Sequence, residues 1–84
     1  MTEAAVTRFF FNYRVGEDYV RDHEGTDLID LASARVEAVK DARHLMSKSI
    51  LGGLDVSGRV FEVCDEAGRV VLEMPFAEAI SRRE

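Results

Sequence analysis

The stretch DLASARVEAVKDARHLMSKSI, residues 30–50, decides the fold. At about 100° per residue, its apolar side chains gather on one side, which predicts one long amphipathic helix. Three alanines, Ala34, Ala38 and Ala42, run down the middle of the apolar arc. Small side chains there let a helix axis approach its neighbours closely. We therefore expect this helix to lie flat on a sheet.

The two ends of the helix carry their own signals. Asp30 can accept hydrogen bonds from the free amides of the first turn, and its charge suits the positive end of the helix. Gly52 and Gly53 follow the last apolar residue, and a glycine tolerates the left-handed conformation that commonly ends a helix.

Arg35 breaks the apolar arc, because it falls at about +40° from Leu31. One interpretation is that its stem packs and its head reaches solvent. The other is an ion pair with an acid of the preceding loop, such as Asp22 or Asp27. We predict the ion pair, which would tie that loop to the helix.

Alternating patterns predict two hairpins around the helix. Residues 7–14 and 19–21 form the first, with a polar loop at 22–27, and residues 59–65 and 69–74 form the second. Residues 76–80 form a short second helix after Pro75. The prediction is an α+β fold of order β-β-α-β-β-α, a four-stranded antiparallel sheet with one long helix on one face. The inward-facing set on the strands is Phe9, Phe11, Tyr13, Phe61, Val63, Val70, Leu72 and Met74.

Length and composition limit the possible classes of protein. The 84 residues predict a single domain, 1–84, with an ordered core at about 7–80. A net charge of −5 argues against a nucleic-acid binder, which needs a basic surface. No apolar run is long enough for a membrane span. The single cysteine, Cys64, and the acidic start favour a reducing, cytoplasmic location.

The sequence contains no recognisable catalytic or cofactor motif. Asp22, His23 and Glu24 are the densest group of metal-capable side chains, but neighbours in an extended loop point in different directions. His44 is placed on the polar helix face, and Cys64 is typical of a small strand residue. We therefore predict no enzyme activity, no catalytic residue, no cofactor and no metal.

Several motifs resemble a family of short bacterial domains of unknown function, common in rhizobia and related α-proteobacteria. That family combines an aromatic first strand, a D-x-x-G loop, an L-x-x-A-R-x-E-A helix start and a D-x-x-G-R hairpin ending in P-F. The matching residues here are 9–11, 22–25, 31–38, 65–69 and 75–76. The resemblance implies no particular activity. Where the family often has histidine after its aromatics, this chain has Asn12. A fainter topological likeness is to acidic antitoxin domains of the HicB type.

Three functions are open at this point. The leading hypothesis is a non-catalytic, self-associating interaction module, a homodimer. It rests on a helix that overhangs its sheet and on apolar residues placed on the far sheet face, namely Phe10, Val60, Cys64 and Val71. The second is a ligand-binding or enzymatic domain that uses loop 22–27 and Arg35. The third is an acidic, antitoxin-like domain that binds a basic protein partner.

Overall fold

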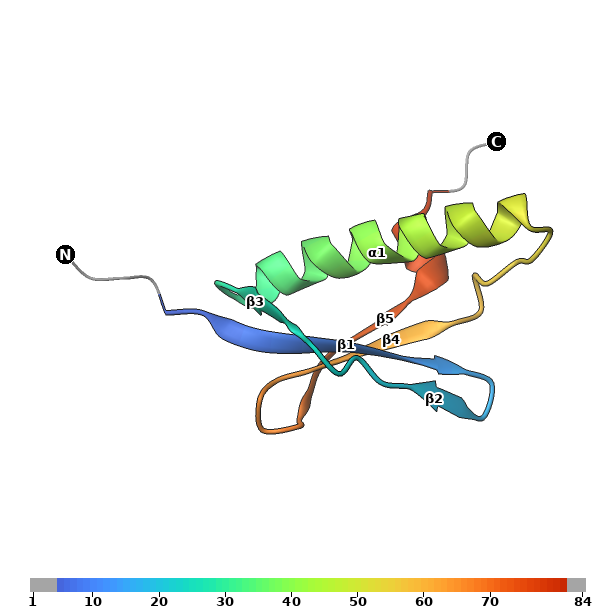
Figure 1. Cartoon of the computed structure of the whole chain (residues 1–84). Helices are drawn as coiled ribbons and strands as arrows, with labels where there is room; N and C mark the ends of the chain where they lie inside the picture. The colour runs from blue at the N-terminus through green and yellow to red at the C-terminus, as the bar shows by residue number, and fades with distance from the viewer. Residues whose placement is uncertain (1–4, 82–84) are drawn as a thin grey trace.

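The structure, a computed structural model, describes residues 5–81, so the chain ends predicted to lie outside the core fall mostly outside the described residues. One long helix lies across one face of an antiparallel sheet and leaves the other face open (Figure 1). The elements in chain order are β1 Thr7–Val15, β2 Asp18–Val20, β3 Thr26–Leu28, α1 Leu31–Leu51, β4 Val60–Cys64, β5 Val70–Pro75 and the 3₁₀ helix η1 Phe76–Ala79.

The predicted α+β fold is confirmed, with one strand more than expected. The main path of the sheet is β2-β1-β4-β5, and β3 also pairs with β1. Both β2 and β3 use the same edge of β1: β2 pairs with residues 13–15 and β3 with residues 7–9. The segment predicted as a polar loop therefore ends in a short strand.

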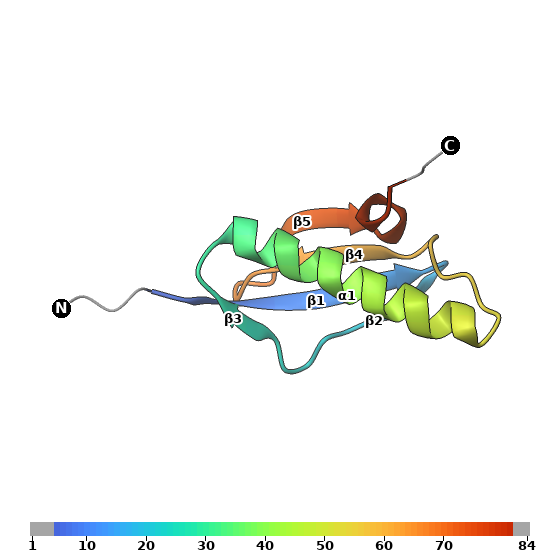
Figure 2. The ribbon, with the colours of Figure 1, turned by 90° about the horizontal axis from the view of Figure 1, so that it is seen from above.

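Helix α1 contacts the sheet through its alanines, as the sequence predicts. Ala34, Ala38 and Ala42 are completely buried, and the helix runs diagonally over the strands (Figure 2). Asp30 is the N-cap, and its carboxylate accepts a 2.8 Å hydrogen bond from the Ser33 amide. At the other end Gly53 supplies the left-handed residue, with φ of +82°.

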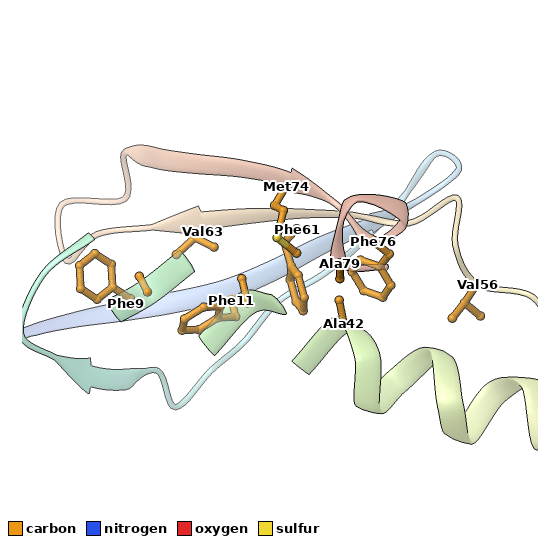
Figure 3. Packing of buried hydrophobic residues seen from close by; sticks show 11 residues of the cluster. Phe9, Phe11, Ala42, Val56, Phe61, Val63, Met74, Phe76 and Ala79 are labelled. Carbon is orange, nitrogen blue, oxygen red and sulfur yellow. The ribbon is translucent and has the colours of Figure 1, made fainter. Parts of the chain in front are cut away.

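The core lies between α1 and the middle of the sheet, where aromatic rings pack against one another. Phe61 packs against Phe11 at 6.1 Å and against Phe76 at 4.7 Å between ring centroids. Figure 3 shows Phe76 and Ala79 of η1 next to Ala42 of the helix. The short helix therefore closes the core where β5 ends.

The inward face of β5 differs from the prediction because the strand contains a bulge. Val63 pairs with Leu72 and Cys64 pairs with Val70, which leaves Val71 as an extra residue. Val70 is consequently on the open face and half exposed, whereas Val71 packs against the core. The sequence-based assignment of Val70 to the core and Val71 to the outer face was wrong, since strict alternation cannot include an extra residue.

The predicted partner of Arg35 was also wrong. The Arg35 guanidinium lies 4.0 Å from the carboxylate of Glu78 in η1, and both side chains are more than half exposed. Loop 22–27 pairs with the far edge of β1 instead. An exposed pair at this distance contributes little to stability.

The alanine packing makes a testable prediction. Ala38→Leu should lower the free energy of unfolding by about 1–3 kcal/mol, because a completely buried contact has no room for three more carbons. Urea denaturation measures it. The matched control is Ala32→Leu, at an exposed position of the same helix, which should change stability by less than about 0.5 kcal/mol. Equal losses in the two variants would contradict the packing.

Candidate functional site

The candidate site begins at a gap in the edge of β1. Residues 10–12 have neither β2 nor β3 beside them, and Asp22 takes the place of a strand there. The Phe11 amide donates to Asp22 Oδ2 at 3.1 Å, and the Asp22 amide donates to Asn12 Oδ1 at 2.8 Å. One residue therefore continues the hydrogen bonding of the edge between two short strands.

The same carboxylate also shapes the turn that follows. Asp22 Oδ1 accepts hydrogen bonds from the amides of Glu24 at 3.2 Å and Gly25 at 3.1 Å. Burial by itself would raise the pKa of Asp22. The hydrogen bonds from the amides of Phe11, Gly25 and Glu24 outweigh burial, so the pKa lies below its usual value.

Position 25 requires glycine for two reasons, its backbone conformation and the lack of room for a side chain. Its φ is +72°, and a Cβ there would lie 2.7 Å from Arg8 Cγ and 2.9 Å from Phe10 Cε1. The D-x-x-G pattern of the loop therefore has a physical meaning: the aspartate binds the turn amides, and the glycine lets the turn lie against β1.

A second aspartate–glycine turn, between β4 and β5, lies beside the first. Asp65 Oδ1 accepts from the amides of Ala67 and Arg69, and Gly68 has φ of +81°. The Arg8 amide donates to Glu66 Oε1 at 3.0 Å, which joins this turn to β1. Two turns that are distant in sequence thus meet at one end of the sheet.

Between the two turns, the open face of the sheet forms a pocket of about 410 Å³. Its volume lies in the range of small-molecule sites. The lining residues come from three stretches of the chain, 10–12, 19–23 and 64–70: Phe10, Asn12, Tyr19, Arg21, Asp22, His23, Cys64, Asp65, Glu66, Gly68 and Val70.

Asn12 is the one buried polar residue among those the structure describes, and it organises the pocket floor. Its amide donates to Cys64 Sγ at 3.5 Å. Tyr19 stands beside it: burial raises the pKa of the Tyr19 hydroxyl, and hydrogen bonding to Asn12 opposes this only in part. The Arg21 guanidinium lies over the Tyr19 ring, 5.7 Å from its centroid.

The structure brings together some of the residues singled out in the sequence and separates others. Asp22, His23 and Cys64 all line the pocket, whereas Arg35 belongs to the opposite side of the sheet. Within residues 5–81, no three metal-capable side chains are arranged to hold an ion. Asn12 and Tyr19 were not predicted as site residues. Asn12 is the one buried polar side chain among residues 5–81, and alternation along a strand cannot show burial.

A second surface lies on the flank of α1 next to η1, and it is apolar. A groove of about 530 Å³ there is lined mainly by Met46, Ile50, Leu54, Val56 and Ile80. Ile50, Leu54 and Ile80 each expose more than half of their surface. The C-terminal end of α1 extends beyond the strands (Figure 1), as its length predicts.

These features define a small α+β domain in which two aspartate–glycine turns frame one end of an open sheet. The sequence matches a protein family described as Domain of unknown function (DUF6894) over residues 8–77, and the chain belongs to that family. No curated protein and no solved structure matches the chain. In the described part of the chain, no helix combines the length and apolar character needed to cross a membrane.

We expect Asp22→Ala to be among the most damaging changes outside the core. It removes the acceptor of three backbone hydrogen bonds, so the free energy of unfolding should fall by about 2–4 kcal/mol at pH 7. The pKa of Asp22 is lower in the folded state than in the unfolded state. Its contribution to the free energy of unfolding is therefore complete above the unfolded-state pKa and is lost as the pH falls through the folded-state pKa. The difference between wild type and variant in urea denaturation should therefore shrink below about pH 4.

A matched control is Asp18→Ala, at an exposed position of β2 where the structure shows no side-chain hydrogen bond within residues 5–81. Its effect should stay within about 0.5 kcal/mol at every pH. A pH-independent loss in Asp22→Ala would show that the carboxylate charge is not what holds the turn.

Gly25→Ala should also destabilise the fold, by about 2–4 kcal/mol, because left-handed strain adds to the clash with Arg8 and Phe10. Gly16→Ala is the comparison. Gly16 has φ of +59° but nothing within 4 Å of an added Cβ, so only the strain of about 1–2 kcal/mol applies. Thermal or urea unfolding measures both. Identical losses would contradict the close approach of the turn to β1.

Proposed function

We propose that the protein is a non-catalytic interaction module of the bacterial cytoplasm, and that it forms a homodimer through the apolar flank of α1. We define this apolar flank as Val36, Val39, Met46, Ile50, Leu54 and Ile80. The observation that carries the proposal is the exposure of this flank: Val36 is 63% exposed and Ile50 is 62% exposed. Contiguous apolar patches of several hundred Å² usually mark contact surfaces.

The spacing along the helix fits another helix as the occupant. Val36, Val39, Arg43, Met46 and Ile50 follow one another at steps of three, four, three and four residues. This is the heptad spacing of helices that pack side by side. It is separate from the alanine stripe, which already faces the sheet.

Arg43 is the one charged residue in this series, and it is turned back onto its own chain. Its Nε donates to the carbonyl oxygen of Ala79 at 2.6 Å, which holds η1 against the helix. The guanidinium therefore does not need to enter a partner's apolar surface. A second copy of the chain offers the same series, and two-fold dimers bury the same patch from both subunits.

The open sheet face is less suited to association than the sequence indicated. Val71 packs against the core, and Cys64 is buried. Arg14 forms ion pairs with both Glu62 and Glu73, which makes the middle of this face charged. The surplus of apolar surface lies instead on the helix flank.

The hydrogen bonds that occupy the two aspartates of the pocket support a non-catalytic role. The Asp22 carboxylate is occupied by backbone amides, and Asp65 is occupied by amides and by the Arg69 side chain, 3.1 Å away. Carboxylates that are bonded in this way act as structural acceptors for turns.

Light scattering after size exclusion tests the proposal. We expect a mass near twice 9.4 kDa at high concentration. Ile50→Lys should shift the dissociation midpoint at least about tenfold toward monomer, because a charge would be buried in the interface. Lysine in the last helical turn is compatible with the helix dipole, so the fold itself should be unaffected.

Ile29→Lys is the matched control, because Ile29 is 64% exposed but lies before the helix, away from the apolar flank. It should leave the mass unchanged. A mass of 9.4 kDa at all concentrations would contradict the homodimer. In that case the net charge of −5 makes a basic protein partner the next prediction to test.

A further inference from the structure

We propose that the pocket on the open sheet face binds a small carboxylate anion with an apolar body. This site lies on the side of the sheet away from the apolar flank of α1, so it is independent of the proposed dimer. Each of the two proposals can fail without the other.

The pocket has an apolar side and a donor side. Phe10, Cys64 and Val70 form the apolar side, on neighbouring strands β1, β4 and β5. Tyr19, Arg21 and His23 form the donor side, on β2 and the turn that follows it. A ligand with an apolar body and an anionic end matches this division.

The acidic residues of the pocket do not oppose an anion as strongly as their number indicates. Asp22 and Asp65 accept hydrogen bonds from turn amides, and Asp65 also pairs with Arg69. Glu66 accepts from the Arg8 amide. Arg21, by contrast, forms no ion pair within residues 5–81, so its positive charge is available at the rim.

The Tyr19 hydroxyl lies at the pocket beside Asn12 and Cys64, and the side chains of both are within hydrogen-bonding reach of it. Because burial raises the pKa of Tyr19, the hydroxyl keeps its proton at neutral pH. The Tyr19 hydroxyl and the Arg21 guanidinium can therefore donate to the same carboxylate.

The experiment is a titration of ¹⁵N-labelled protein, followed by NMR, with benzoate, phenylacetate and isovalerate as probes. We expect at least one probe to cause saturable shifts at the amides of Phe10, Asn12 and Cys64. Its neutral amide, such as benzamide for benzoate, should bind at least about tenfold more weakly, because it lacks the charge that Arg21 recognises.

The chain supplies a matched pair of controls. Tyr19→Phe and Arg21→Gln should each weaken binding about tenfold. Tyr13→Phe and Arg59→Gln alter the equivalent stacked pair, in which Arg59 lies 5.4 Å from the Tyr13 ring, and should leave affinity unchanged. The proposal is overturned if none of the three probes gives saturable shifts at the pocket, if the neutral amides bind equally well, or if the control variants lose as much affinity.

Discussion

The hydrogen bonds of Asp22 are the constraint on which the open side of this domain depends. Strand β1 is nine residues long, whereas β2 and β3 have three residues each, so together they cannot cover its edge. A buried or half-buried strand edge with unpaired amides is costly. Asp22 satisfies the Phe11 amide, binds two amides of its own turn and gives its own amide to Asn12. The conformation of the turn, the position of β3 and the floor of the pocket therefore all depend on Asp22.

A second constraint acts on the helix side. A domain of this size buries a limited share of its surface, so the helix must approach the sheet closely. The completely buried alanines permit that approach, but they add little apolar volume. The larger side chains of α1, such as Val36 and Ile50, are consequently displaced to its flank and remain exposed. Close packing of the core and a surplus of apolar surface outside it therefore have the same origin.

Local signals predicted the elements well, and the site poorly. The helix, its Asp30 cap and the glycine end are local in sequence, and they appear where the pattern placed them. The bulge at Val71 and the Arg35–Glu78 pair depend on how separate elements meet in the folded chain. Alternation along a strand and angles around a helix carry no information about such contacts. The pocket was missed for the same reason, because its lining comes from three separate stretches of the chain. The two D-x-x-G patterns were visible, but only the fold shows that they meet.

The strand edges explain why association through the helix is favoured over extension of the sheet. One edge of the sheet is formed by β2 and β3, which have only three residues each and are separated by the turn that contains Asp22. The other edge of the sheet is formed by β5. There the Phe76 amide points inward to the Arg59 carbonyl oxygen, so the preceding Pro75 nitrogen faces outward. A proline at that position presents no donor to an incoming strand. The bulge at Val71 and the exposed Glu73 charge further interrupt the edge. Because one edge is short and interrupted and the other is interrupted by a proline, a bulge and a charge, the apolar flank of α1 is the surface best suited to a second copy.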